Sequence, residues 1–211
     1  VENLIKTVSS DVGSSALVWG QNKFDLSQPF NRIPFFNLLS DELGCDISMM
    51  DYTQLRKLCM DKGLKVESKN NIGQLLDLLM SELVEPKLLN PTFVIDYPKS
   101  ISPLAKMHRN GNKTIVERFE LFIGGSEFAN SFSELNDPID QRNRLEEQVK
   151  LKELGDDEAH PIDESFIQAM ENGMPPTGGV GIGIDRLTML LTGNHSIKDV
   201  ILFPALKSEK E

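Results

Sequence analysis

The sequence predicts an α+β protein with a mainly antiparallel sheet, flanked by helices and carrying a helical insertion. Three observations predict this class. Short apolar strand segments come partly as hairpins, helical segments separate them in the last half of the chain, and helix signals dominate residues 31–90. Strands joined by tight turns pair antiparallel, so the class is α+β and not a parallel α/β sheet.

Bulk composition excludes several classes of protein. The 211 residues are 39% hydrophobic and 26% charged, which is typical of one folded domain or one domain with an insertion. The net charge of -10 argues against a broad phosphate-binding surface, because nonspecific nucleic-acid affinity needs clustered Lys and Arg. No apolar run approaches bilayer length and no signal-peptide pattern opens the chain. Cys45 and Cys59 lack metal-type spacing, so we expect both to be reduced and buried in a cytoplasmic protein.

The first thirty residues predict a helix followed by a hairpin. The helix signal is a set of apolar residues at helical spacing: Leu4, Ile5, Val8 and Val12. The segments "ALVWG" and "KFDL" then flank a turn at Gln21–Asn22.

Residues 31–90 are expected to be helical. One helix follows Asn71, which forms a variant capping box with Gln74. Its apolar face comprises Ile72, Leu75, Leu76, Leu79 and Leu83. A second helix is predicted from Asp51, with Gly63 as its stop. No convergent polar groups occur here, which favours a packing or insertion module.

Residues 91–211 alternate strand and helix signals. The expected strands are "TFVID", "VERFELFI", "SEFANSFSEL" and a last strand, "DVILFP". One helix is capped by Asp137 and ends before Gly155, and "DESFIQAMENG" predicts another. The stretch "GGVGIGIDRLTMLLTG" runs from a strand into a helix that stops at Gly193.

Carboxylates stand among apolar residues on both sides of Gly124–Gly125, which predicts a two-residue turn. A regular ladder from that turn pairs Phe122 with Glu127 and Glu120 with Ala129. Glu120 and Glu127 then share a sheet face as diagonal neighbours, roughly 7–8 Å apart at the backbone. They repel each other unless a cation lies between them. Hard oxygen ligands of this kind suit magnesium, usually completed by substrate phosphates.

The residues Asn130, Phe132 and Glu134 alternate with the opposite parity to Glu127. A regular strand would send the two sets to opposite faces, so a common cleft requires a bulge near Phe128 or Ala129. The open alternative is that one face is wet and its glutamates are merely exposed. Glu117 is expected to be only solvated.

Glycines alternate at 179, 181 and 183 in "GGVGIGIDR", which leaves one strand face without side chains. The stretch is neither a dinucleotide fingerprint nor a P-loop. Arg186 follows at the start of a helix, where the dipole does not favour a cation. Binding an anion or stacking on a base would explain it. The alternative is close helix–sheet packing with an Asp185–Arg186 surface pair.

At these residues the sequence resembles the class II lysyl-tRNA synthetases. The resemblance is carried by "RFELFIGGSEFANSFSELNDPIDQR", "PPTGGVGIGIDRLTMLLT" and "DVILFPA" and covers essentially all residues, most specifically after Pro91. The glycine–arginine stretch is similar to motif 3 of class II synthetases generally, whereas "FELFIGGSEFANSFSEL" favours the lysine enzyme over the aspartate and asparagine ones. The resemblance implies that lysine attacks the α-phosphate of ATP, and that the lysyl group then passes from lysyl-adenylate to tRNA(Lys).

The resemblance also implies roles at the ATP end of the site. Glu120 and Glu127 match magnesium ligands at the ATP phosphates. Arg186 matches the motif 3 arginine, a catalytic residue that clamps ATP. Gly183 matches part of the bare strand beneath the nucleotide.

At the lysine end, the resemblance assigns four residues to amino-acid binding. Asn130 matches a contact to the lysine carboxylate and Phe132 a wall of the pocket. Glu134 matches a carboxylate that meets the ε-ammonium group, and Gly181 lies in the bare strand beneath it. A site built around a buried carboxylate rejects side chains that leave it unpaired.

The resemblance further implies a division of the chain. Residues 1–30 would begin a catalytic-domain segment, 31–90 would be a helical insertion, and 91–211 would be the C-terminal part with motif 3. The anticodon-binding barrel and motifs 1 and 2 have no counterpart here, so we expect the piece alone to be inactive or nearly so. The intact protein is expected to be a cytoplasmic homodimer.

Two other interpretations stay open. One is a paralogue that lysylates a protein instead of a tRNA. The other is a noncatalytic binding module derived from a synthetase. Retention of Glu120, Glu127, Asn130, Glu134 and Arg186 together argues against the second, because a degenerate copy has no chemical reason to keep that set.

Overall fold

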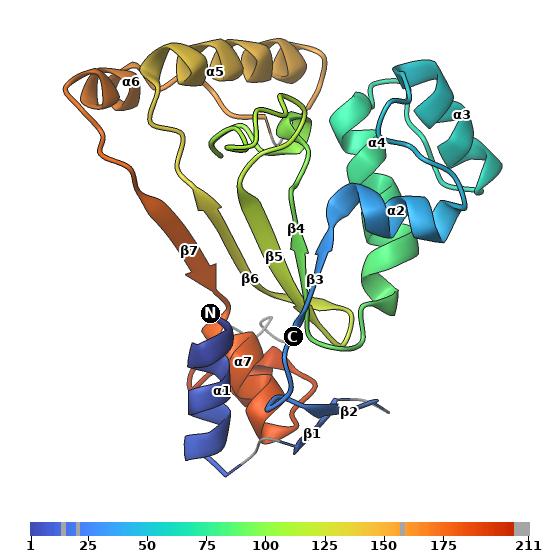
Figure 1. The fold of residues 1–211 in the computed structure, drawn as a ribbon, viewed down its shortest axis with the longest axis vertical. Coiled ribbons are helices and arrows are strands. Elements are labelled where there is room, and N and C mark those ends of the chain that lie inside the picture. The colour runs from blue at the N-terminus through green and yellow to red at the C-terminus, as the bar shows by residue number, and fades with distance from the viewer. Residues whose placement is uncertain (14–15, 20–21, 157–158, 205–211) are drawn as a thin grey trace, which may run out of the picture.

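A twisted five-stranded sheet forms the centre of the chain, in the order β3-β4-β5-β6-β7 (Figure 1). The computed structural model describes residues 1–13, 16–19, 22–156 and 159–204. The strands are β3 (Asn31–Pro34), β4 (Thr92–Ile95), β5 (Arg118–Ile123), β6 (Ser126–Ser133) and β7 (Gly178–Ile182). β3 runs parallel to β4, and every other neighbouring pair is antiparallel. The predicted α+β class with a mainly antiparallel sheet is therefore confirmed.

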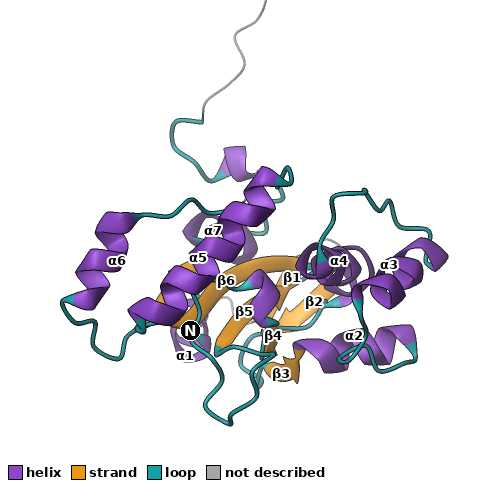
Figure 2. Cartoon of the chain, turned by 90° about the horizontal axis from the view of Figure 1, so that it is seen from above, coloured by secondary structure: helices purple, strands orange, loops and turns teal. Residues whose placement is uncertain are grey.

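Helices surround this sheet in three groups. They are α1 (Glu2–Asp11), α2 (Phe35–Leu43), α3 (Tyr52–Asp61), α4 (Ile72–Leu79), α5 (Pro138–Glu153), α6 (Glu164–Glu171) and α7 (Ile184–Thr192). Helices α2 to α4 gather beside β3, while α1 and α7 lie at one end of the sheet with the small hairpin β1 (Ala16–Trp19) and β2 (Asn22–Asp25). Figure 2 looks down on the other end, where α5 crosses over the strands. None of the helices described has the length and apolar character needed to cross a membrane.

Local capping signals in the sequence are confirmed. The side chains of Asp51 and Asn71 each accept a hydrogen bond from the backbone N–H of the glutamine three residues on, and their own backbone N–H groups donate to that glutamine's side chain, so both form capping boxes. Asp137 caps α5, as predicted. Its carboxylate accepts hydrogen bonds from the backbone N–H groups of Ile139 and Asp140. On α4 the residues Leu75, Leu76 and Leu79 are buried, whereas Ile72 is exposed.

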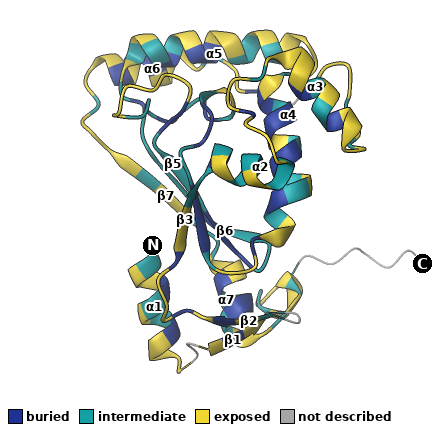
Figure 3. Cartoon of the chain, turned by 45° about the vertical axis from the view of Figure 1, so that its right-hand side comes forward, coloured by how far each residue is buried: buried dark blue, intermediate teal, exposed yellow. Residues whose placement is uncertain are grey.

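Two hydrophobic clusters pack against the sheet. One joins the insertion helices to Val94 and Phe122. The other joins α1, α7 and the small hairpin to Phe93, Leu121 and Phe128. Alternate residues of β5 therefore enter different clusters, as the two faces of a strand require. Figure 3 shows the buried residues gathered along the sheet and α4.

Four expectations fail on particular residues. Asn31–Pro34 is a strand and not part of the helical region, because its backbone pairs with Thr92–Ile95. "DVILFP" forms no strand among the described residues. Instead Ile197–Asp199 is a 3-10 turn, and Leu202 and Phe203 beyond it are 89% and 92% exposed. A strand requires a neighbouring edge, and the described chain brings none to this segment.

The other two failures concern the cysteines and the small hairpin. Cys59 is buried but Cys45 is exposed. A turn is predicted at Gln21–Asn22. Asn22 instead lies in strand β2 and pairs with Trp19 of β1. Gln21 lies outside the described residues.

The turn predicted at Gly124–Gly125 is confirmed. It packs between two segments distant in sequence, one at Trp19 and one at Pro86. Both glycines have positive φ, +61° and +75°. A Cβ on Gly124 would lie 2.5 Å from the Trp19 ring, and one on Gly125 would lie 3.4 Å from Pro86. The N–H groups of the two glycines donate to the carbonyls of Leu89 and Leu88. The turn thus joins the sheet to the small hairpin and to the end of the insertion.

Replacing Gly124 by Ala should destabilise the chain through both its backbone angle and the Trp19 overlap. We expect a loss of about 2–4 kcal/mol in the free energy of unfolding, measured by urea denaturation. The matched control is Gly44→Ala, because Gly44 has φ +72° but nothing within 4 Å of a Cβ. It should lose only about 1 kcal/mol. Equal losses in the two variants would contradict the close packing against Trp19.

Candidate functional site

A bulge in β6 sets the geometry of the site. Phe122 lies opposite Glu127, but the next residue of β5, Leu121, lies opposite Ala129. Phe128 is the extra residue and is buried in the core. The bulge predicted near Phe128 or Ala129 is confirmed. The pairing of Glu120 with Ala129 is wrong, because beyond the bulge Glu120 lies opposite Asn130.

The bulge brings the predicted site residues to one face of the sheet. Glu120 is opposite Asn130, and Phe132 is opposite Arg118. On the other side of β6, Asn130 faces Gly181 and Phe132 faces Gly179 in β7. Residues directly opposite each other point to the same side. The polar residues of β5 and β6 therefore share a face with the bare strand β7.

Glu120 is held by two neighbours and is not merely solvated. Its side chain is 13% exposed. The Tyr97 hydroxyl donates to one carboxylate oxygen at 2.7 Å, and Arg118 Nη2 donates to the other at 2.5 Å. The Arg118 guanidinium also lies over the Tyr97 ring, 4.6 Å from its centre. Burial and the charge of Glu120 raise the pKa of Tyr97 well above its usual value. The alternative that this face is solvent-exposed and its glutamates merely solvated is therefore wrong for Glu120.

Negative charge accumulates where β5 and β6 approach the end of the insertion. Burial, then the charge of Glu120, raises the pKa of Glu127 above its ordinary value. Burial raises the pKa of Glu85 to about 7, with further contributions from the charges of Glu120, Asp77 and Glu127. These carboxylates thus lie within electrostatic reach of one another. Glu85 is absent from the sequence prediction, because nothing local distinguishes a glutamate before a proline.

The carboxylates fit a cation that also takes ligands from a substrate. Within the described ranges, no three Asp, Glu, His or Cys side chains are placed to hold a metal by themselves. A divalent cation beside Glu120 and Glu127 would relieve their repulsion. Magnesium commonly binds through one or two carboxylates plus phosphate oxygens, so this pair could hold it together with a nucleotide.

Arg186 reaches back from α7 to the carboxylates. Its Nη1 donates to the Glu127 backbone carbonyl at 2.7 Å and lies 3.8 Å from the Glu127 carboxylate. The side chain passes over Gly183, where a Cβ would lie 3.6 Å from Arg186 Cβ. Its surface pairing is with Glu127 and not with Asp185. The guanidinium is 53% exposed, so most of its donors are free to meet an anion.

At the opposite end of the same face, Glu134 lies against the backbone of Gly179. A Cβ on Gly179 would overlap with the Glu134 carboxylate. Burial raises the pKa of Glu134. In the part of the chain that the structure describes, no Lys, Arg or His forms an ion pair with Glu134. A half-buried carboxylate without a cation is thus placed over a strand without side chains.

Glu117 is not merely solvated, contrary to expectation. Arg109 donates to both of its carboxylate oxygens, at 2.5 and 2.9 Å. The hydrogen bond from Arg109 lowers the pKa of Glu117 to about 2 despite its burial. Arg109 and Glu117 line the same hollow as Glu134. This ion pair therefore closes one side of the Glu134 pocket.

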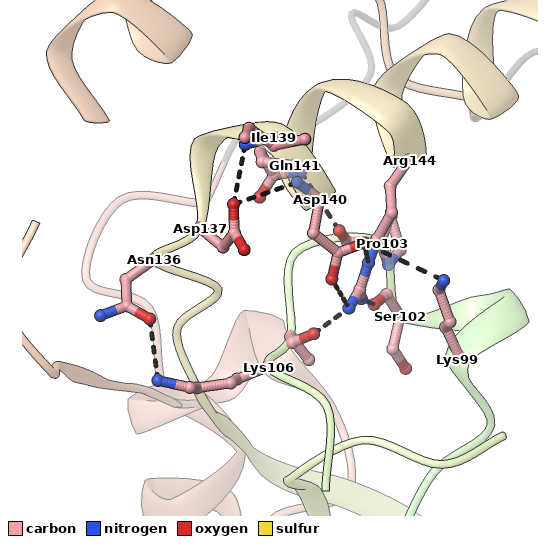
Figure 4. A network of polar contacts seen from close by, with 11 residues as sticks. Lys99, Ser102, Pro103, Lys106, Asn136, Asp137, Ile139, Asp140, Gln141 and Arg144 are labelled. Carbon is pink, nitrogen blue, oxygen red and sulfur yellow. Dashed lines mark hydrogen bonds and ion pairs between the residues drawn. The ribbon is translucent and has the colours of Figure 1, made fainter. Parts of the chain in front are cut away.

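A polar network attaches α5 to the loop below it (Figure 4). Arg144, only 2% exposed, binds the Asp140 carboxylate and donates to the carbonyls of Ser102 and Ala105. Gln141 donates to the Pro103 carbonyl. The loop residues 101–103 thus have a structural role that the sequence left unassigned.

The sequence analysis missed Arg118 and Tyr97 as site residues. Arg118 was within its reach, since it stands two positions before Glu120 in the strand and therefore on the same face. Tyr97 was not, because it follows β4 in a segment without regular alternation.

The family model described as "tRNA synthetases class II (D, K and N)" matches residues 1–207. A lysine--tRNA ligase of Gloeobacter violaceus is 52% identical over 211 residues, which cover 99% of this chain and 42% of that protein. Enzymes with the same name from Porphyromonas gingivalis and Nostoc sp. are 47% and 51% identical, and the match covers 36% and 37% of their lengths. The chain thus spans well under half of the length of these relatives.

Replacing Glu85 by Gln should change how stability depends on pH. Because the folded-state pKa of Glu85 is raised from 4.5 to about 7, its contribution is fully present below pH 4.5 and is lost as pH rises through 7. The full shift corresponds to roughly 3 kcal/mol. Solvent screening of this half-buried group reduces it to about 1–2 kcal/mol.

Glu85→Gln should therefore gain about 1–2 kcal/mol relative to the unchanged chain between pH 5 and pH 8. Urea denaturation at each pH measures this difference. Glu82→Gln, an exposed position three residues earlier, is the control and should follow the unchanged chain. Parallel stability profiles for Glu85→Gln and the unchanged chain would contradict the raised pKa.

Proposed function

Because the chain belongs to the class II tRNA synthetases of the aspartate, lysine and asparagine group, we propose that it binds lysine and ATP in a lysine--tRNA ligase. The observation that carries the proposal is Glu134, a half-buried carboxylate without a cation partner among the described residues. It shares a face with the carboxylates and the arginine that suit MgATP. The names of the relatives at about 50% identity support the same activity.

At the lysine end, Glu134 receives the ε-ammonium group. Burial has raised the pKa of Glu134, so an arriving cation compensates a carboxylate that has lost part of its hydration. Phe132 forms a wall beside the aliphatic part of lysine, and Gly181 leaves room beneath it. Asn130 donates to the lysine carboxylate. A neutral side chain of similar length would leave Glu134 unpaired, which provides discrimination.

At the ATP end, Glu120 and Glu127 would hold Mg²⁺ together with the nucleotide phosphates. The metal, when bound, neutralises phosphate charge and orients the leaving group. Arg186 donates to ATP as the catalytic cation, and Gly183 lets it lie flat against the strand. The lysine carboxylate then attacks the α-phosphorus of ATP, and the bond to pyrophosphate breaks. The resulting lysyl-adenylate passes its lysyl group to tRNA(Lys).

The division of the chain is part of the proposal. Residues 31–90 form an insertion in the catalytic domain, supported by the register of β3 and β4, which places Asn31 beside Thr92 so that the two ends of the insertion meet. We also propose a cytoplasmic homodimer, as the family resemblance implies. The free cysteines Cys45 and Cys59 agree with a reducing compartment.

Replacing Glu134 by Gln in the full-length enzyme tests the proposal. Loss of a charged hydrogen bond to the ε-ammonium should lower kcat/KM for lysine about 10- to 150-fold, corresponding to roughly 1.5–3 kcal/mol. The KM for ATP should change little. Lysine-dependent ATP–pyrophosphate exchange measures both constants. Glu146→Gln, at an exposed position on α5, is the charge-matched control.

Two outcomes would count against the proposal. Unchanged lysine kinetics in Glu134→Gln would remove Glu134 from lysine recognition. Absence of lysine-dependent exchange in the unmodified full-length enzyme would refute the activity itself and favour a noncatalytic module.

A further inference from the structure

We propose that Arg118 is a positioning residue that orients Glu120 at the ATP end and Asn130 at the lysine end of the same site. The inference rests on the proposed function. Its physical basis is that one guanidinium contacts both groups: Nη2 donates to Glu120 Oε1 at 2.5 Å, and Nε donates to Asn130 Oδ1 at 3.3 Å. Glu120 and Asn130 lie directly opposite each other on β5 and β6. Arg118 therefore connects two functional side chains that belong to different substrates.

Arg118 is itself held rigidly. Its Nη1 donates to the Ile101 carbonyl at 2.8 Å and to Ser102 Oγ at 2.9 Å. Its guanidinium lies on the Tyr97 ring, and its side chain is 16% exposed. Four of the five N–H donors of the guanidinium are thus used in one plane. The side chain cannot rotate without losing several of these bonds.

The orientation of the Asn130 amide follows from this contact. A guanidinium has donors only, so the atom of Asn130 that faces it must be the carbonyl oxygen. The NH₂ group then points away from Arg118 and is free to donate. A lysine carboxylate has acceptors only and requires such a donor. With the amide reversed, Asn130 would present an oxygen to the carboxylate and repel it.

Glu120 is oriented by the same guanidinium together with Tyr97. Each carboxylate oxygen receives one donor, from Arg118 on one side and Tyr97 on the other. Each oxygen keeps a further lone pair, so the carboxylate can still bind a cation. Burial and the charge of Glu120 raise the pKa of Glu127, and the charges of Arg186 and Arg118 offset part of that rise. Arg118 thus limits repulsion between the two acidic groups without occupying the space between them.

The loop that anchors Arg118 is in turn anchored to α5. Arg144 holds the backbone of Ser102 and Ala105, and Gln141 holds that of Pro103 (Figure 4). On that loop, the Ile101 carbonyl and the Ser102 hydroxyl accept the hydrogen bonds from Arg118 Nη1. The buried network therefore sets the position of Arg118 from outside the site. Residues 101 and 102 therefore position Arg118 through the Ile101 carbonyl and the Ser102 hydroxyl.

The test is a comparison of KM values in the full-length enzyme, measured by lysine-dependent ATP–pyrophosphate exchange. Arg118→Lys keeps the charge but loses the planar fork. We expect it to raise the KM for lysine and the KM for MgATP together, each at least about tenfold. Tyr97→Phe loses only the donor to Glu120. It should raise the KM for MgATP about fivefold and leave the KM for lysine unchanged.

Ser102→Ala provides a second route if Arg118→Lys fails to fold. It removes one anchor of Arg118 and leaves the arginine in place, so both KM values should rise together by about two- to fivefold. Thermal unfolding and active-site titration establish the folded fraction of each variant. A purely structural role would lower the active fraction without changing KM.

Defined results would overturn the proposal. In Arg118→Lys, or in Ser102→Ala if that variant alone folds, unchanged KM values or a change in only one of them would show that Arg118 does not serve both ends. A rise of the KM for lysine in Tyr97→Phe would show that a change at Glu120 also affects the lysine end, and that the two ends cannot be perturbed independently. If the unmodified enzyme lacks lysine-dependent exchange, the proposed function fails, which is a different result from a failure of the Arg118 variants alone.

Discussion

The extra residue in β6 controls the direction of every side chain on the candidate site. A strand alternates with a period of two, so one inserted position reverses all the side chains that follow. By turning into the core, Phe128 lets Glu127 before it and Asn130 after it face the same side. Without the bulge, the carboxylate that suits a metal and the residues that suit lysine would lie on opposite faces. The pairing register of β5 with β6 also shifts by one residue across the bulge.

Charge on this face is arranged as an acidic region with arginines beside it. Glu120, Glu127 and Glu85 form this region, and burial, with added repulsion from the neighbouring carboxylates, raises the pKa of Glu85 to about 7. Arg118 pairs with Glu120, Arg186 lies beside Glu127, and both offset part of that charge. Each arginine also makes hydrogen bonds to fixed oxygens. The face can thus remain acidic, and receptive to cations, without separating its strands.

Much of the support for the site comes from outside the sheet. The turn at Gly124–Gly125 contacts Trp19 on one side and Pro86 on the other, so the small hairpin and the insertion both bear on the end of β5 and β6. At the opposite end, the buried Arg144 fixes the loop that holds Arg118. The site residues are therefore oriented by elements distant in sequence. This is the usual requirement for a preorganised site.

Caps, turns, strand alternation and the need for a bulge were determined by the sequence itself, because each depends on residues within a few positions of one another. Asp51, Asn71 and the Gly124–Gly125 turn are cases of this kind. Only the tertiary structure decided that Glu85 joins the acidic region and that "DVILFP" pairs with no strand in the described chain. Such outcomes depend on which distant segments meet. Packing and long-range electrostatics determine those meetings, and they leave no periodic signal in a single sequence.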